Sequence, residues 1–236
     1  MGCMGLKDPA GFSAAPLGVA DPVTLTQPGT AAARRAQYGE GSTDRGRRTR
    51  AVLLEAARRV FERDGYVDAR VADIARLAGV AHGTFYTYFD SKREVFRAVM
   101  AEVRDQIAEA IAMPAARPTG VIERLDLANR RFLDVYRGNS RLMLLFEQVA
   151  TIDPEIGEYR QCSRRAHVDR IAGGIRRLQR RGLADPELDP RTAAAALVSM
   201  LTNFAYHWLA MEEPFDEELA KRTLTRLWAS ALGLRS

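Results

Sequence analysis

Hydrophobic residues recur at helical spacing through most of the chain. In the first such segment, which begins near Arg47, apolar pairs return every four residues and predict one stripe along a helix. These pairs are Val52/Leu53, Ala56/Ala57 and Val60/Phe61. Gly65 then supplies the left-handed residue that ends a helix, and Tyr66 can pack back on its last turn.

Start and stop signals predict three further segments after this helix. A short helix places Val71, Ile74, Ala75 and Ala78 inward and stops at Gly79, and another helix begins near His82. The run Ser91-Lys92-Arg93-Glu94 is a capping box for a long helix. That long helix continues until Pro114 and Pro118 break it.

The remaining pattern is also helical, and no segment alternates like a strand over a useful length. Asp153-Pro154 and Asp189-Pro190 each combine an N-cap residue with a first-turn proline. The expected helices are Thr119–Tyr136, Ser140–Thr151, Asp153 to about Arg181, Asp189 to about Met211, and Asp216 to about Leu232. The sequence therefore predicts an all-α fold.

Residues 193–211 contain no charged residue and are long enough to cross a membrane. Against that interpretation, the segment carries Ser199, Thr202, Asn203 and His207, and the run of four alanines at 193–196 weakens its hydrophobicity. A helix that is apolar all round is otherwise buried in a core or a subunit interface. We therefore expect a buried helix and no membrane partner.

Composition adds a clustered positive charge. The chain of 236 residues has a formal net charge of +5, with 47% hydrophobic and 28% charged residues. Residues 45–100 hold 12 basic and 7 acidic residues, so this one segment carries a net charge of +5. Clustered positive charge favours a polyanion partner, nucleic acid before membrane. Residues 1–44 are rich in Gly, Pro, Ala, Ser and Thr, and we expect a disordered arm there.

The few cysteines and histidines limit which disulfides, metal sites and catalytic groups the chain can form. Cys3 and Cys162 are too few for a disulfide framework, which favours a cytoplasmic protein. The three histidines form no metal-ligand cluster, and no nucleophile–base pair or phosphate-cradling glycine loop is present. We expect no catalytic residue, no metal and no cofactor.

The stretch from Ala78 to Lys92, AGVAHGTFYTYFDSK, has an unusual composition for a buried helix. Phe85 and Phe89 are four residues apart and share an inward face. Small polar residues and tyrosines lie on the other faces, which is typical of a helix-turn-helix whose second helix enters a major groove.

The run VFERDGYVDARVADIARLAGVAHGTFYTYFDSKREVF resembles the DNA-binding domain of TetR-family transcriptional regulators. The resemblance implies a three-helix DNA-binding domain at residues 45–95 and a larger helical ligand-binding and dimerisation domain at residues 96–236. It implies DNA contacts by His82, Gly83, Thr84, Tyr86, Thr87, Tyr88 and Lys92, to which we add Arg47, Arg48 and Arg70. Tyr88 is equally compatible with packing in the small core, and His82 and Gly83 also have purely structural interpretations.

The chain departs from the family pattern at two helix starts. Ala81 precedes the recognition helix where Ser or Thr is usual, and Ala69-Arg70 replaces the usual hydroxyl residue before the preceding helix. Asp68 is a substitute cap for that preceding helix, and Arg70 replaces a hydroxyl–phosphate contact with a charged one. Lys92 and Arg93 are both expected to face phosphate.

We expect a homodimer through the last two helices, Arg191–Met211 and Asp216–Leu232, packed as a four-helix bundle against their symmetry mates. Nine residues have two interpretations: they line an apolar cavity for a lipophilic effector, or they are ordinary core residues. These candidate lining residues are Phe132, Met143, Phe146, Tyr159, Cys162, Met200, Asn203, Phe204 and Trp208.

Taken together, the sequence favours a ligand-responsive homodimeric repressor that binds a palindromic operator in double-stranded DNA and is released by a small effector. An activator or a ligand-independent regulator remains open within this class. Outside it, the alternative is an all-α small-molecule carrier or enzyme with an incidental helix-turn-helix; turnover of a ligand would favour that alternative.

Overall fold

Helices are the regular elements of the protein, and the computed structural model describes residues 44–112 and 120–234. No strand occurs in these two ranges, so the predicted all-α fold is confirmed. The elements are α2 (Asp44–Asp68), α3 (Val71–Leu77), α4 (His82–Tyr88), α5 (Lys92–Ile111), α6 (Val121–Gly138), α7 (Ser140–Ile152), α8 (Pro154–Arg180), α9 (Pro190–Ala205), the π-helix η1 (Tyr206–Ala210) and α10 (Glu217–Ala231). The expected N-terminal arm, apart from Asp44, and the expected break at Pro114 and Pro118 lie outside the described residues.

Helix α2 follows the predicted pattern with one correction. Gly65 has a φ of 75° and interrupts the helix where the sequence predicts its end. The predicted apolar stripe includes Val52, but this side chain is 48% exposed, whereas Leu54 is buried. Residues 52–54 are all apolar, and the pair buried in the core is Leu53 and Leu54, where the pattern predicts Val52 and Leu53.

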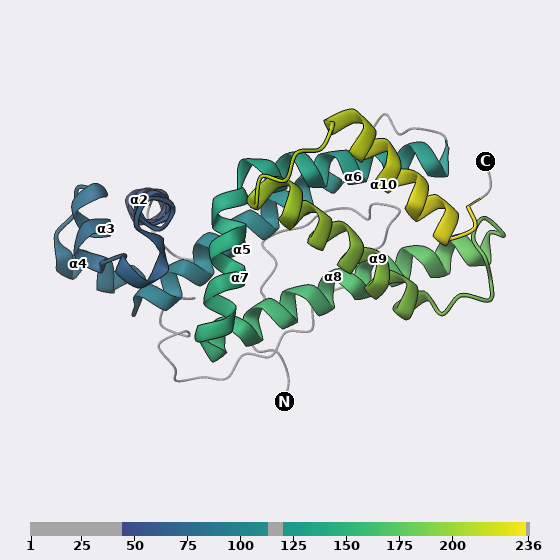
Figure 1. Ribbon diagram of the computed structural model, residues 1–236. Coiled ribbons are helices and arrows are strands. Elements are labelled where there is room, and N and C mark those ends of the chain that lie inside the picture. The colour runs from purple at the N-terminus through teal and green to yellow at the C-terminus, as the bar shows by residue number, and fades with distance from the viewer. Residues whose placement is uncertain (1–43, 113–119, 235–236) are drawn as a thin grey trace.

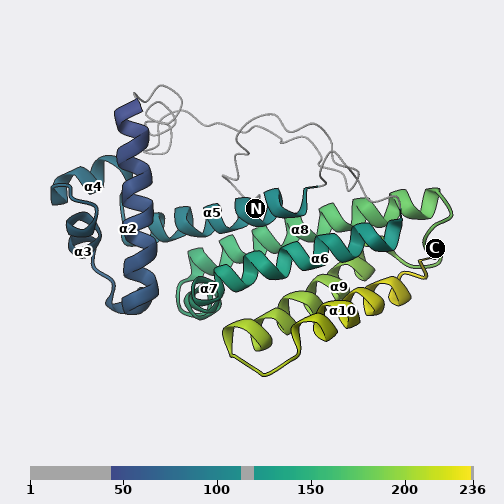
Figure 2. The ribbon, with the colours of Figure 1, turned by 90° about the horizontal axis from the view of Figure 1, so that it is seen from above.

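The helices form a small group at one end of an elongated bundle (Figure 1). Helices α2, α3 and α4 make up this end, and α5 runs from it into the body formed by α6 to α10. Seen from above, α2 lies across the direction of α5, and α10 ends at the far end of the bundle (Figure 2).

Two clusters of buried apolar side chains hold the helices together. The first contains residues of α2 to α5 together with Leu142, Phe146 and Val149 of α7 and Ile156 and Tyr159 of α8. The second joins α6, the later part of α8, α9, η1 and α10. Met143 and Ile107 pack against both clusters. The core of the helix-turn-helix end is therefore continuous with the first turns of α8.

Aspartate caps start the last three long helices, as the sequence predicts for α8 and α9. Asp153, Asp189 and Asp216 each accept a hydrogen bond from a backbone N–H in the first turn of α8, α9 and α10 respectively. Each such cap contributes about 1 kcal/mol to helix stability. The uncharged segment 193–211 forms α9 and the π-helix η1, and no helix in the described ranges is long and apolar enough to cross a membrane.

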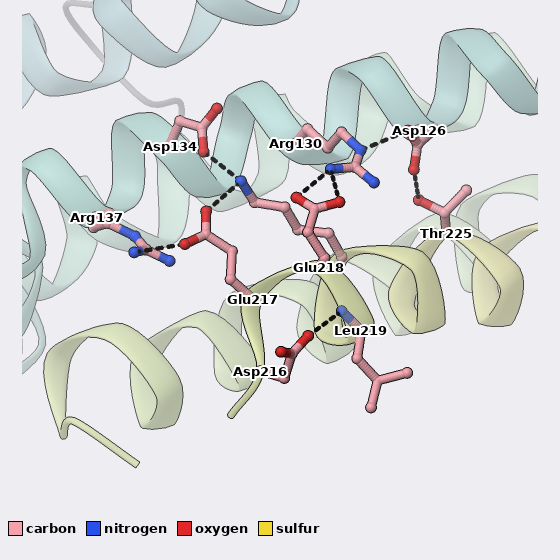
Figure 3. A network of polar contacts seen from close by, with 10 residues as sticks. Asp126, Arg130, Asp134, Arg137, Asp216, Glu217, Glu218, Leu219 and Thr225 are labelled. Atoms are coloured by element: carbon pink, nitrogen blue, oxygen red, sulfur yellow. Dashed lines mark hydrogen bonds and ion pairs between the residues drawn. The ribbon is translucent and has the colours of Figure 1, made fainter. Parts of the chain in front are cut away.

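A polar seam joins α6 to α10 (Figure 3). The buried ammonium group of Lys221 lies 2.8 Å from Asp134 and 2.7 Å from Glu217. Arg130 donates to both carboxylate oxygens of Glu218, at 2.8 and 2.9 Å. Because these side chains reach across the two helices, they fix the position of α10 along α6 as well as its distance.

Candidate nucleic-acid interface

A tight turn separates α3 from α4. Gly79 has a φ of 67°, a conformation that non-glycine residues rarely adopt. The N–H of Val80 donates to the carbonyl oxygen of Ala75 at 3.0 Å, which closes the turn. The predicted glycine-dependent stop after Ala78 is thus present in the structure.

Helix α4 is held by two phenylalanines. Phe85 and Phe89 are almost fully buried and their ring centroids are 5.7 Å apart. The guanidinium group of Arg50 on α2 lies 5.3 Å from the Phe89 ring centroid, which ties the end of α4 to α2. These contacts leave the opposite side of α4 free to face a partner.

The predicted DNA-contacting residues of α4 divide into exposed and half-buried positions. His82, Gly83, Tyr86 and Thr87 are exposed, with Tyr86 48% exposed. The rings of His82 and Tyr86 meet edge to face at 5.4 Å, so they form one aromatic surface. Thr84 and Tyr88 are half-buried, and Tyr88 packs against the first apolar cluster. Tyr88 therefore makes the core contact that the sequence left open.

The starts of α3 and α4 have no side-chain caps. The N-cap residues are Arg70 and Ala81, and neither side chain accepts a backbone hydrogen bond. The proposed substitution of Asp68 as a cap is wrong, because Asp68 belongs to the end of α2 and Arg70 occupies the N-cap position.

The arginines of this end differ in whether a carboxylate neutralises them. Arg47 pairs with Asp44, Arg59 with Glu55, Arg63 with Asp64 and Arg76 with Asp73. The guanidinium groups of Arg45, Arg48 and Arg70 make no hydrogen bond or ion pair within the part of the chain that the structure describes. Arg45 and Arg48 line an open groove with Val52 and Val80, at the turn between α3 and α4.

Arg45 is absent from the residues that the sequence singles out, although a signal for it exists. No acidic residue lies three or four positions away from Arg45, so no local helical ion pair can neutralise it. Arg47, which the sequence does single out, has such a partner in Asp44.

Lys92 has a structural role in addition to its expected contact with phosphate. Its Nζ atom donates to the carbonyl oxygens of Val67 and Ala69, both at 2.9 Å, and lies 4.9 Å from the Tyr66 ring centroid. Burial lowers the pKa of this ammonium group. An ammonium group has three donors, so one N–H is left for a phosphate oxygen.

Arg93, which the sequence also assigns to phosphate, makes ion pairs within the protein. Its guanidinium group pairs with Asp153 and Glu155 at the start of α8. Ser91 caps α5 by accepting from the N–H of Glu94 at 3.1 Å, as predicted. The return bond of the predicted capping box is displaced by one residue, since Glu94 accepts from the N–H of Asp90 at 2.6 Å.

The nine candidate effector-lining residues do not form one group. Phe146 and Tyr159 belong to the first apolar cluster, whereas Phe132 and Trp208 belong to the second. Met200 and Phe204 pack against the second cluster, Met143 packs against both, and Cys162 is buried on α8. Asn203 lies on the exposed side of α9.

Two surface pockets lie away from these nine residues. One is the groove beside Arg45 and Arg48, and the other, of about 140 Å³, lies between α7 and α8 and is lined by Glu147 and Arg160 among others. Within residues 44–112 and 120–234, no group of three or more His, Cys, Asp or Glu is arranged to hold a metal ion.

Comparison with known proteins identifies this architecture. Residues 53–99 match the family described as bacterial regulatory proteins, tetR family. The chain is 29% identical to the transcriptional repressor BepR of Brucella suis, over 71% of this chain and 84% of that protein. It is 28% identical to the transcriptional activator FasR of Mycolicibacterium smegmatis, over 81% of this chain and 88% of that protein.

Solved structures agree with these sequence matches in fold. The transcriptional regulator FadR from Bacillus subtilis, in complex with stearoyl-CoA, superposes with a TM-score of 0.64 at 20% identity, over 77% of this chain and 98% of that chain. Residues 53–99 therefore carry a domain of the tetR family, and the chain as a whole is similar in fold to TetR-family transcriptional regulators. Its relatives are transcriptional regulators and not enzymes, in agreement with the expectation from the sequence.

Proposed function

We propose that this protein is a homodimeric repressor that binds an inverted repeat in double-stranded DNA and acts in the cytoplasm. The observation that carries the proposal is the exposed surface of α4, where His82, Tyr86 and Thr87 project from a helix held by Phe85 and Phe89. The unpaired Arg45, Arg48 and Arg70 supply positive charge for phosphate on the same domain. In such an interface, phosphate contacts set the position and base contacts set the sequence.

A homodimer through α9 and α10 is supported by their exposed side chains. Leu219, Thr223 and Leu227 recur every four residues on α10, and the two leucines are 58% and 49% exposed. Ala196, Ser199 and Asn203 give α9 an exposed strip of small and polar residues. Burial of the exposed half of each leucine against a second copy would stabilise the dimer by roughly half of the 1.5 to 3 kcal/mol that full burial of a leucine contributes.

Repression, and not activation, is the direction that we propose for the regulation. Among the relatives, BepR is named a repressor and FasR an activator. A bound dimer that overlaps a promoter lowers transcription without any further contact, so repression requires fewer assumptions. In a transcription assay with purified polymerase and the selected site placed over the promoter, added protein should lower transcript yield. An increase would assign activation instead.

We propose further that a lipophilic effector releases the DNA by binding among α5 to α9. FadR, a similar structure, was solved with stearoyl-CoA. In the present chain, the buried hydroxyl groups of Tyr159 and Ser163 lie near each other on α8, and neither makes a well-formed hydrogen bond with another described residue. Buried groups of this kind favour a ligand that brings its own polar atom into an apolar surrounding.

The DNA-binding proposal is tested by selection from a library of random duplexes, followed by sequencing. The expected product is one inverted repeat with half-sites about 34–36 Å apart, or a multiple of that spacing. Recovery of isolated half-sites, or of no common sequence, would contradict the proposal.

The effector proposal is tested by thermal unfolding with a series of fatty acyl compounds of increasing chain length. A ligand at 100 times its Kd stabilises the native state by about 2.7 kcal/mol and raises the melting temperature. The same compound should release the selected duplex. Stabilisation without release would contradict the effector role.

A further inference from the structure

The guanidinium group of Arg93 connects the start of α5 with the start of α8. Its Nε atom lies 2.7 Å from Oδ2 of Asp153, and its Nη1 atom lies 2.5 Å from Oε1 of Glu155. The two partners are 60 and 62 positions away along the chain. Arg93 directly follows the recognition helix and its turn, so this contact joins the DNA-binding end to the body of the protein.

The carboxylate of Asp153 serves both helix starts. Its Oδ1 atom accepts from the backbone N–H groups of Glu155 and Ile156, at 3.0 and 3.3 Å, and so caps α8. Its other oxygen receives Arg93, and the side chain is only 11% exposed. Burial acts to raise the pKa of Asp153, but the guanidinium group and the two backbone donors outweigh burial and hold the pKa below its ordinary value. The carboxylate is therefore charged and fixed.

Tyr66 extends this contact into the core of the helix-turn-helix end. Its ring stacks on Phe61 at 6.0 Å and meets the edge of Phe96 at 5.0 Å. Burial and the nearby carboxylate of Asp153 raise the pKa of its hydroxyl, whereas Arg93 acts in the opposite direction. The hydroxyl thus lies beside the Arg93–Asp153 pair, and the ring lies among the side chains that hold α2 on α5.

An arginine that binds phosphate needs a guanidinium group without nearby carboxylates, whereas an arginine that joins two helices is held by carboxylates. Two of the five N–H donors of the Arg93 guanidinium group, on Nε and Nη1, are taken by the two carboxylates, which fix the plane of the group. The adjacent acidic groups also reduce the attraction of this position for a phosphate. Arg93 therefore differs from Arg48, whose guanidinium group has no partner among the described residues.

We infer that Arg93 is a positioning residue for DNA binding, which fixes the helix-turn-helix end against the first turn of α8 through Asp153 and Glu155. In this arrangement a shift of the start of α8 moves the two recognition helices of the dimer relative to each other. The inference rests on the proposed DNA-binding function and adds the contact through which the body of the protein controls it.

The test is a double-mutant cycle for DNA affinity with Arg93→Gln, Asp153→Asn and the double variant. Asparagine remains a good N-cap residue, so Asp153→Asn removes the charge and keeps the cap. Each single variant should weaken binding of the selected duplex on the order of tenfold, and the double variant should be no weaker than the single ones. Arg93→Lys should lie between the parent and Arg93→Gln.

The dependence of affinity on salt separates this role from a phosphate contact. Loss of a phosphate contact lowers the slope of log affinity against log salt by about 1. For Arg93→Gln and Asp153→Asn we expect an unchanged slope. A slope lowered by about 1 in Arg93→Gln, together with full affinity in Asp153→Asn, would overturn the inference.

Hydrogen exchange without DNA keeps this test independent of the proposed function. In Arg93→Gln, amides in the first turns of both α5 and α8 should exchange faster than in the parent. Arg59→Gln is the matched control, because Arg59 pairs with Glu55 on the surface of α2 alone. Faster exchange in α5 with unchanged α8 would contradict the inference, whether or not the parent binds a specific duplex. Failure of the parent to select any duplex would instead contradict the proposed function.

Discussion

The ammonium group of Lys92 donates a hydrogen bond of 2.9 Å to the carbonyl oxygen of Val67, 25 residues earlier in the chain. The same group bonds the carbonyl oxygen of Ala69. Lys92 thus holds the segment between α2 and α3 against the start of α5. A residue that the sequence assigns to phosphate also keeps the helix-turn-helix assembled.

Replacement of Lys92 should therefore affect folding as well as binding. Hydrogen bonds to a charged donor contribute about 1.5 to 3 kcal/mol each at most, so we expect Lys92→Met to lower the free energy of unfolding by about 2 kcal/mol. Urea unfolding followed by circular dichroism measures this change. An unchanged free energy of unfolding, with DNA affinity lost, would leave phosphate binding as the only role of Lys92.

Among the arginines, the unpaired ones should dominate the dependence of DNA affinity on salt. Arg48→Gln should weaken binding to all duplexes alike and lower the salt slope by about 1. Arg76→Gln is the control, since Arg76 is paired with Asp73 at 2.7 Å. Titrations at several salt concentrations measure both slopes. Equal slopes for the two variants would contradict this prediction, because a paired and an unpaired arginine would then contribute equally to phosphate binding.

Local signals allowed much of the fold to be predicted. Gly65 interrupts α2 and Gly79 follows the end of α3, because each takes a positive φ, and Asp153 and Asp189 cap α8 and α9 through N–H groups of the next turn. These interactions need only neighbouring residues. The inward position of Phe85 and Phe89 likewise follows from their spacing of four.

Long-range contacts account for what the sequence did not predict. Nothing near Arg93 in the chain indicates that its partners are Asp153 and Glu155, and nothing near Lys92 indicates the carbonyl oxygens of Val67 and Ala69. The choice of Leu54 over Val52 for the core depends on how α2 packs, because both belong to one apolar run. The candidate lining residues could not be grouped for the same reason.

Acid should destabilise the protein partly through His167. Burial, together with the charges of Arg170 and Arg164, lowers the pKa of His167 from 6.5 to about 3. Its Nδ1 atom lies 2.6 Å from a guanidinium nitrogen of Arg170, which suits a neutral ring that accepts a hydrogen bond. Between these two pKa values the unfolded chain binds one more proton, so the free energy of unfolding falls as the pH falls through this window.

The measurement compares the parent with His167→Gln. Protonation of this one histidine lowers the free energy of unfolding by at most about 1.4 kcal/mol per pH unit, and by less because the side chain is not fully buried. Urea unfolding at several pH values from about 7 down to about 4 should give a shallower pH dependence for the variant. Parallel curves for the two proteins would mean that the ring is charged or solvated in the native state.

The exposed leucines of α10 give a direct test of the dimer. Leu227→Asp places a charge on the proposed interface, where an unpaired charge is costly to bury, so the variant should sediment as a monomer. Ile152→Asp is the control, because Ile152 is 64% exposed at the end of α7 and belongs to neither α9 nor α10. A dimeric Leu227→Asp variant at micromolar concentration would place the interface elsewhere.

The central claim is that the exposed surface of α4 recognises DNA sequence. The measurement that tests it most directly is a titration of the selected inverted repeat, and of a scrambled duplex of equal length, with the parent and with Tyr86→Ala. Base–aromatic or phosphate contacts of this kind are worth about 1 to 3 kcal/mol, so Tyr86→Ala should bind the repeat at least fivefold more weakly while remaining a folded dimer. Its preference for the repeat over the scrambled duplex should shrink as well. Equal affinity and equal preference for the two proteins would contradict the account.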